Sequence, residues 1–274
     1  MLIFSQILQT TLPVLYGAIA LSYLFYFYTR IAALSRVATV ALLVTAVLHL
    51  GHTVVLGIIA MRHPMATIFE FLSFVAMTMA FIFLFLETWY RNGYIGAFAL
   101  PAVFVLQLCA SLGIQPAVAV TPLLEEVRFA LHATAFAAAY AAFLLGLLFG
   151  VMVILFERSV KRHHFGIVFE QLPSLSVLGK MTASTLLLGF VFMSIGLGLG
   201  AWNVMHAPTD LQMDAKVLLT ILVWLVYGFA IFSRFVLRWS DESTAILSIA
   251  GFALLAFTTV ATHVTFSSWH NFVG

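Results

Sequence analysis

Residues 129–156 read FALHATAFAAAYAAFLLGLLFGVMVILF and contain no Asp, Glu, Lys or Arg. An α-helix rises about 1.5 Å per residue, so about 20 apolar residues cross the roughly 30 Å of hydrocarbon in a bilayer. This stretch is longer than that, and its polar side chains are few. It therefore predicts a membrane-spanning helix, which sets the fold class of the whole chain.

Seven similar apolar runs lie on either side of this stretch. We expect the other spans at 8–28, 37–61, 67–88, 94–113, 181–202, 214–237 and 244–266. Of the 274 residues, 64% are hydrophobic and 8% are charged, whereas roughly 25% are charged in soluble domains. The sequence predicts an all-α, polytopic membrane bundle of about eight transmembrane helices, with residues 1–274 forming a single integral membrane domain.

Charge and cysteine content exclude several other classes of protein. The net charge of +2 is small and scattered, so no nucleic-acid partner is expected. The single cysteine, Cys109, lies in an apolar run and cannot form an internal disulfide, a CxxC pair or a thiolate zinc site. No basic residue precedes Arg30, so we expect residues 8–28 to be a retained helix and not a cleaved signal peptide.

The loops between the expected spans alternate in basic charge. One set of alternate loops contains most of the Lys and Arg residues: Arg30, Arg36, Arg91, Arg158, Lys161, Arg162, Lys180, Arg234 and Arg238. The other set contains only Arg62, Arg128 and Lys216. Since cytoplasmic loops carry an excess of basic residues, we expect the first set in the cytoplasm and both termini on the outer, periplasmic side.

The longest expected cytoplasmic loop covers residues 157–180. Its apolar residues have the spacing of one face of a short helix on the membrane surface: Phe165, Val168, Phe169, Leu172 and Leu175. An irregular connector interrupted by Pro173 explains the same pattern equally well.

Two histidines lie within the second expected span. His49 and His52 are three residues apart, so at about 100° per residue they share one flank of that helix. His52 lies about 14 Å from the outer end of the span, near the middle of the bilayer. An ionisable group at that depth is a candidate functional residue, and the alternative is a neutral imidazole bonded to a neighbouring helix.

Further histidines are expected near the outer side. His132 opens the fifth span and His270 follows the eighth, so their helices can bring them together across a bundle. Two neutral imidazoles on opposite faces of a porphyrin form a six-coordinate haem site, although a solvated interfacial histidine fits the same pattern. His263, near the outer end of the last span, is a weaker ligand candidate. His63 and His206 are either contacts of a ligand or solvated loop residues.

Other polar residues near the outer helix ends have defined expected roles. Thr67 and Glu70 have the spacing of a capping box, which favours a structural role for this carboxylate. Lys216 opens the seventh span, where the helix dipole disfavours a cation unless an anion such as a propionate or lipid phosphate lies beside it. Trp202 is an interfacial aromatic residue or a porphyrin contact. The glycines of 196–200 keep the sixth span thin, so that a helix or a ligand can approach closely.

Several of these motifs, in this order, resemble the cytochrome c assembly family of membrane proteins, of the CcsA and HemX type, and most closely its HemX-like branch. The resemblance covers the chain from about residue 45 to its end. The motifs that carry it are His52-Thr53, His63-Pro64, Thr67-Ile68-Phe69-Glu70, Leu131-His132, Tyr140-Ala141-Ala142-Phe143, Asp214-Ala215-Lys216 with Trp224 and Tyr227, and His270.

The resemblance implies a bacterial inner-membrane protein that handles haem b without a covalent bond. It implies His132 and His270 as the axial ligands, and partners among cytochrome-assembly or haem-biosynthesis proteins. In better-understood members, haem is presented to apocytochrome c beneath a tryptophan-rich outer loop. Here that loop has one tryptophan, Trp202, and Phe232 replaces a second membrane histidine. The chain is therefore not expected to be a full cytochrome c synthase.

Three functional hypotheses follow. The first is a haem-binding protein, more a carrier than an enzyme, with the axial pair His132 and His270, contacts from Trp202 and Lys216, and a possible second site at His52. The second is a membrane regulator or scaffold that contacts a haem-biosynthesis or cytochrome-assembly enzyme through the loop 157–180. The third is a small-molecule transporter with His49 and His52 as a relay, which the scarcity of other charged residues in the spans disfavours.

Overall fold

The computed structural model describes residues 2–114, 126–163, 165–206 and 215–265. These residues form α-helices joined by turns, without any β-strand. In chain order the helices are α1 (Leu2–Thr29), α2 (Ala32–Ala60), α3 (Ile68–Tyr90), α4 (Gly96–Gly113), α6 (Val127–Lys161), α7 (Ile167–Gln171), α8 (Leu175–His206), α9 (Ala215–Phe235) and α10 (Asp241–Thr265). Eight of them, all except the five-residue α7, are long and apolar enough to span a membrane. The predicted all-α, multi-pass architecture is confirmed.

The expected spans and the helices agree in place but not always in length. The helix α6 covers Val127–Lys161 where 129–156 was expected, and α8 covers Leu175–His206 where 181–202 was expected. Hydropathy detects only the part of a helix that contacts hydrocarbon. The backbone continues its hydrogen bonding through polar residues at both ends, so the helices extend past the apolar runs.

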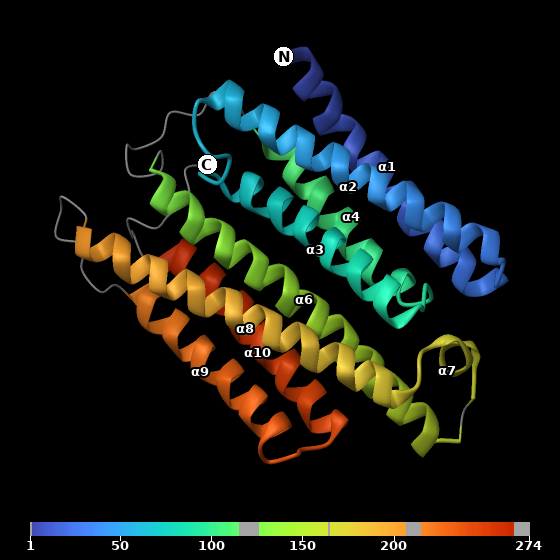
Figure 1. The fold of residues 1–274 in the computed structure, drawn as a ribbon. Coiled ribbons are helices and arrows are strands. Elements are labelled where there is room, and N and C mark those ends of the chain that lie inside the picture. The colour runs from blue at the N-terminus through green and yellow to red at the C-terminus, as the bar shows by residue number, and fades with distance from the viewer. Residues whose placement is uncertain (1, 115–125, 164, 207–214, 266–274) are drawn as a thin grey trace.

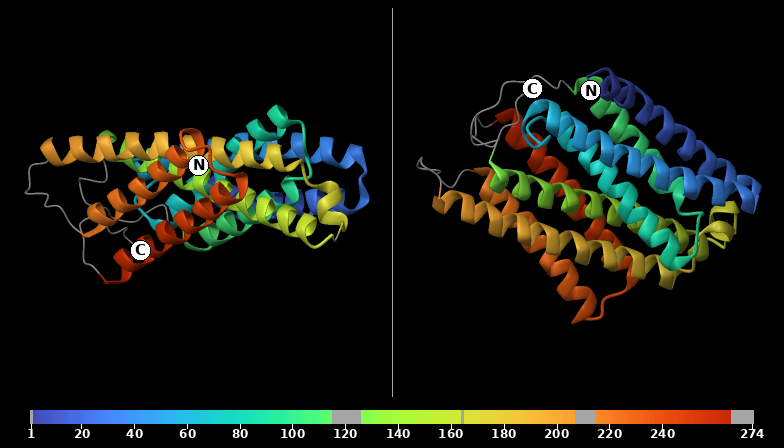
Figure 2. Two further views of the ribbon diagram at one scale, coloured as in Figure 1. Left: turned by 90° about the horizontal axis from the view of Figure 1, so that it is seen from below. Right: turned by 45° about the horizontal axis from the view of Figure 1, so that its top comes forward.

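By their mutual contacts the long helices form two groups of four. The two groups lie side by side (Figures 1 and 2). The first bundle contains α1, α2, α3 and α4, and the second contains α6, α8, α9 and α10. Contacts between α3 and α6 join them. One apolar core extends from Tyr23 and Phe83 in the first bundle to Phe149 in α6, and a smaller core around Phe143 and Tyr227 lies within the second bundle.

The described connections between helices lie at two opposite ends of the molecule. Figure 1 shows the turns α1/α2 and α3/α4 and the helix α7 at one end, which we call the basic end because its connections contain the Arg-rich and Lys-rich loops. The α2/α3 turn lies at the opposite end, which we call the far end. The starts of α6 and α9 also lie at the far end, so successive long helices run in opposite directions.

The long connection between α6 and α8 contains one short helix. The helix α7 ends at Gln171, shortly before Pro173, as expected for a residue that cannot continue a helix. The ring of Phe169 packs against Phe156 of α6 with ring centroids 4.7 Å apart, and Leu172 is buried. This part of the connection therefore packs on the bundle and does not present all its apolar residues to a membrane surface.

Candidate functional site

A cavity of about 710 Å³ opens between the helices of the second bundle, with the start of α3 as one wall. This volume lies within the usual range for small-molecule sites. Its lining is mostly apolar and comes from Ile68 and Phe71 of α3; Phe129, His132, Ala133, Phe136 and Tyr140 of α6; Ser194, Leu197, Gly200, Ala201, Val204 and Met205 of α8; Lys216, Val217, Leu219, Thr220, Ile221 and Trp224 of α9; and Leu255, Thr258 and Thr259 of α10. Met205 is 73% exposed, so the cavity reaches the surface at the far end.

His132 is held in the cavity wall by a hydrogen bond to a neighbouring helix. Its Nδ1 lies 2.9 Å from the carbonyl oxygen of Gly196 in α8. A carbonyl only accepts, so Nδ1 carries the hydrogen and the lone pair of the neutral imidazole lies on Nε2. The rings of Phe129 and Phe136 lie on either side along α6, with centroids 6.2 and 4.9 Å from that of His132. Metal-ligating histidines usually have this arrangement, in which the other ring nitrogen donates to a carbonyl or carboxylate.

The glycines of α8 allow this close approach of α6. A Cβ atom at Gly200 would lie 2.9 Å from Cε1 of His132, and one at Gly196 would lie 2.7 Å from the ring of Phe136. At Gly198, by contrast, a Cβ atom would meet nothing within 4 Å. The expected close approach at 196–200 is therefore found at two of the three glycines, those that face α6.

Polar contacts form the floor of the cavity on its basic-end side. Trp224 of α9 donates its Nε1 hydrogen to Ser194 Oγ of α8 at 2.8 Å. Between α6 and α10, the hydroxyls of Tyr140 and Thr259 are hydrogen-bonded. Both pairs cross between helices and belong to the lining, so they fix the depth of the cavity. Lys216 lies nearer the far end, at the start of α9, where it supplies a cationic group to an otherwise apolar wall.

The histidines of α2 lie in the first bundle, away from this cavity. His49 is fully buried, with its Nε2 2.9 Å from Ser73 Oγ and its Nδ1 3.1 Å from the hydroxyl of Tyr16. Ser73 donates its own hydrogen to Gln107 Oε1, so it must accept from His49 Nε2. His49 is therefore a neutral imidazole with both nitrogens bonded, which is the structural alternative considered for it.

His52 differs from His49 in its bonding. It is also fully buried, but its Nε2 has only a long contact of 3.4 Å with Ser5 Oγ. Its Nδ1 has no hydrogen-bond partner among the described residues. A buried ring nitrogen without a hydrogen bond costs folding free energy, so His52 remains a candidate functional residue.

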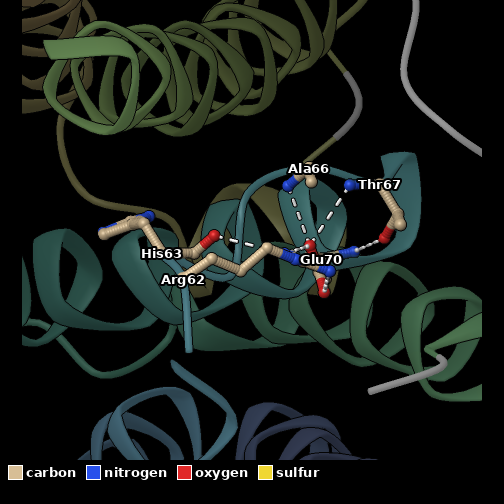
Figure 3. A network of polar contacts seen from close by, with 5 residues as sticks. All are labelled: Arg62, His63, Ala66, Thr67 and Glu70. Atoms are coloured by element: carbon tan, nitrogen blue, oxygen red, sulfur yellow. Dashed lines mark hydrogen bonds and ion pairs between the residues drawn. The ribbon is translucent and has the colours of Figure 1, made fainter. Parts of the chain in front are cut away.

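A buried ion pair lies at the start of α3, at the far end of the molecule (Figure 3). Arg62 binds Glu70 with two hydrogen bonds of 2.9 Å, and both side chains are only 2% exposed. Glu70 also accepts from the backbone of Ala66 and Thr67, while Thr67 Oγ1 accepts from the backbone of Glu70. This is the predicted capping box. The carboxylate has a structural role because four donors occupy it.

The imidazole of His63 points away from that pair (Figure 3). It packs against Phe74 of α3, and its buried Nδ1 has no partner among the described residues. Burial is the main cause that lowers the pKa of His63 below its ordinary value. Glu70 opposes this effect and Arg62 adds to it. His63 is therefore kept neutral beside the cap, and it is not the freely solvated loop residue of the simpler interpretation.

A model of the cytochrome c assembly protein family matches residues 65–270, more than half of the chain. The chain belongs to the cytochrome c assembly protein family. It is similar to Protein HemX of Brevibacillus brevis, with 26% identity over 93% of this chain and 95% of the relative. It is also similar to the cytochrome c biogenesis protein CcsA of Pyropia yezoensis, with 23% identity over 88% of this chain and 89% of the relative.

The matched segment of the cytochrome c assembly family contains all the residues that line the cavity. It begins at residue 65, after His52 and His63, so the family model itself does not cover the histidines of α2 or of the turn that follows. The cavity of the second bundle is therefore the part of this family member on which the family model bears directly.

The structure brings together some of the predicted site residues. His132 and Lys216 line the same cavity. Trp202 is 43% exposed and is not among the lining residues, and His52 lies in the other bundle. His263 is within α10, but its side chain is outside the described residues, as is the whole of His270.

Several lining residues were not expected from the sequence. Phe71 of α3 and Thr258 and Thr259 of α10 belong to the cavity of this cytochrome c assembly family member. The only signal for the threonines was a polar pair in an apolar run. Nothing in the sequence of α3 distinguishes Phe71 from the other apolar residues of that helix.

Proposed function

We propose that the chain is a haem-binding, haem-handling protein of the bacterial inner membrane, with haem b held non-covalently in the cavity of the second bundle. The observation that carries the proposal is the imidazole of His132 on the wall of an apolar cavity, with Nδ1 bonded to the Gly196 carbonyl, so that the lone pair that can ligate iron lies on Nε2. Family membership supports it, since the relatives are named for cytochrome c biogenesis.

The residues of the cavity fit such a ligand. The aromatic rings of Phe129 and Phe136 beside His132 suit a flat apolar macrocycle. Lys216, at the far end of the same cavity, suits the propionates of haem, which need a cation when they leave water. A volume of about 710 Å³ accommodates a ligand of drug size or somewhat larger. Three independent features thus favour one amphipathic, anionic, planar ligand.

His132 and His270 are the proposed axial ligands, and Trp202 and Lys216 are the proposed contacts at the rim. His52, with its unsatisfied Nδ1, is a possible second site in the first bundle, and His263 is a weaker candidate ligand. By the distribution of basic residues, the far end faces the periplasm together with both termini.

The chain's own residues bind and orient the group. Bound haem supplies redox and ligand-exchange chemistry at iron, whereas the side chains of the cavity set its position and exclude water. Among the described cavity residues we assign none a catalytic role, and the protein acts as a carrier or a store. Proteins that assemble cytochromes or make haem are the proposed partners.

Visible spectroscopy of the purified protein tests the proposal. Haem-loaded wild type should show the sharp Soret and reduced α bands of bis-histidine ligation. His132→Ala should lose them or become high-spin, and His270→Ala should do the same. His163→Ala, which alters an exposed histidine at the basic end, is the matched control and should leave the spectrum unchanged. Identical spectra for wild type and His132→Ala would remove the assignment.

A further inference from the structure

On the basic-end side of the cavity, the second bundle contains two buried hydroxyls that have no hydrogen-bond partner among the described residues. These are the phenol of Tyr227 in α9 and the hydroxyl of Ser248 in α10. Both residues are 0% exposed. In a bilayer core an unsatisfied polar group costs several kcal/mol, because no solvent replaces its missing partner. Two such groups in one bundle therefore need an explanation.

Ser248 points into a junction of three helices. Gly146 of α6 lies at this junction, where a Cβ atom would be 3.1 Å from Ser248 Oγ and 3.1 Å from Thr185 Oγ1 of α8. Thr185 donates its hydrogen to the carbonyls of its own helix, so its oxygen retains the capacity to accept. The junction therefore offers a donor from α10 and an acceptor from α8, with only a glycine from α6 between the helices.

Tyr227 lies one helical turn nearer the cavity. Its hydroxyl is 3.4 Å from the position of a Cβ atom at Gly251, which is three residues after Ser248 on the same side of α10. Its ring stacks on Phe143 of α6 with centroids 3.6 Å apart. Phe143 is in turn three residues after Tyr140, which belongs to the cavity floor. The phenol of Tyr227 is thus located between the floor and the Ser248 junction.

The polar spacing continues from Ser248 toward the basic end. Thr244 and Asp241 precede Ser248 by four and seven residues, so they lie on the same face of α10. Thr244 is buried, and Asp241 is paired with Arg234 of α9 at the basic end. Small and hydroxyl-bearing residues on one helix face often serve only close helix packing. Close packing, however, does not explain two hydroxyls that remain unbonded.

We propose that this region is an internal water-binding site, whose water joins the hydroxyls of Tyr227 and Ser248 on the basic-end side of the cavity floor. Buried water in proteins occupies sites that offer it two to four polar partners. Here the partners are the phenol of Tyr227, the hydroxyl of Ser248 and the acceptor oxygen of Thr185. The proposal concerns the protein without ligand and is independent of haem.

The sign of a stability change tests the proposal. If Ser248 binds water, Ser248→Ala removes a partner of that water, and the unfolding temperature in detergent should fall by about 2–4 °C. If the junction is dry, the same change removes an unsatisfied group, and the unfolding temperature should stay the same or rise. Ser233→Ala is the matched control, because Ser233 is equally buried but already donates to Ala230 at 2.9 Å. Tyr227→Phe should change the unfolding temperature in the same direction as Ser248→Ala.

Infrared spectroscopy of the haem-free protein gives a second, direct measurement. Internal water has O–H stretching bands that shift when the protein is exchanged into H₂¹⁸O. Such bands should be present in wild type and in Ser233→Ala, and should be reduced in Ser248→Ala. Wild type without shifting bands, together with a stabilised Ser248→Ala, would overturn the proposal. Neither result depends on whether His132 binds haem.

Discussion

Replacing Gly200, which lines the cavity, by alanine should disturb the orientation of His132. The new Cβ atom would lie 2.9 Å from Cε1 and 3.1 Å from Nδ1 of His132. Ordinary contact begins at 3.4 Å, so the nearer ring atom must move by 3.4 − 2.9, or 0.5 Å. That movement is imposed on a ring whose Nδ1 hydrogen bond to the Gly196 carbonyl is 2.9 Å long. The substitution therefore acts on the orientation of the imidazole.

The expected magnitude differs between stability and ligand binding. A weakened hydrogen bond costs about 1 kcal/mol, whereas alanine is about 1 kcal/mol more favourable than glycine within a helix, so the two effects on stability nearly cancel. Loss of the partner that orients a ligating histidine typically lowers metal affinity by about 10–100-fold. We therefore expect Gly200→Ala to fold normally and to bind haem about 10–100-fold more weakly than wild type.

Gly198→Ala is the control, because a Cβ atom there meets nothing within 4 Å and the residue is exposed. It gains the same helix propensity without approaching His132. The assay is titration of the purified haem-free variants with haem, followed by Soret absorbance. Equal dissociation constants for Gly200→Ala and Gly198→Ala would refute the role assigned to the His132–Gly196 bond.

Two further predictions concern the far end of α3. Glu70→Gln leaves Arg62 buried without its counter-charge and should lower the unfolding free energy by about 3–5 kcal/mol, whereas Glu170→Gln, in a half-exposed pair, should cost about 0–1 kcal/mol in the same denaturation experiment. Because burial lowers the pKa of His63, the unfolded chain binds more protons there, so stability falls as the pH decreases through the ordinary histidine pKa of about 6.5. Between about pH 5 and pH 8, the unfolding free energy of His63→Gln should change less with pH than that of wild type, whereas His163→Gln should behave like wild type. Parallel curves of unfolding free energy against pH for all three proteins would contradict this.

Sequence patterns sufficed for the helices because apolar length is a local property. All eight expected spans are found, and the capping box of Thr67 and Glu70 follows from spacing alone. The partner of Glu70 could not be predicted in the same way. The sequence identifies Arg62 only as one of the few basic residues of its set of loops. Its ion pair with Glu70 depends on the turn that brings Arg62 back over the start of α3.

The different bonding of the two histidines in α2 could not be predicted from the local sequence. Spacing correctly placed His49 and His52 on one flank, but their different states depend on other helices. His49 is satisfied by Tyr16 of α1 and Ser73 of α3, while His52 has only a long contact with Ser5. Which neighbour lies opposite a given turn is decided by helix packing, and one sequence carries no direct record of that. The cavity is beyond sequence reasoning for the same reason, since five helices contribute to it.

The helix α3 connects the two histidine regions physically. Its residue Phe71 lines the cavity of His132, and Ser73, two residues later on a different face, accepts the hydrogen bond of His49. The position of both faces is fixed at the far end by the cap of Glu70, which four donors hold in place. A rotation or shift of α3 would therefore alter the cavity wall and the buried bonds of the first bundle together. Glu70 precedes Phe71 by one residue and Ser73 by three, so the buried cap holds the backbone of α3 within one turn of both contacts.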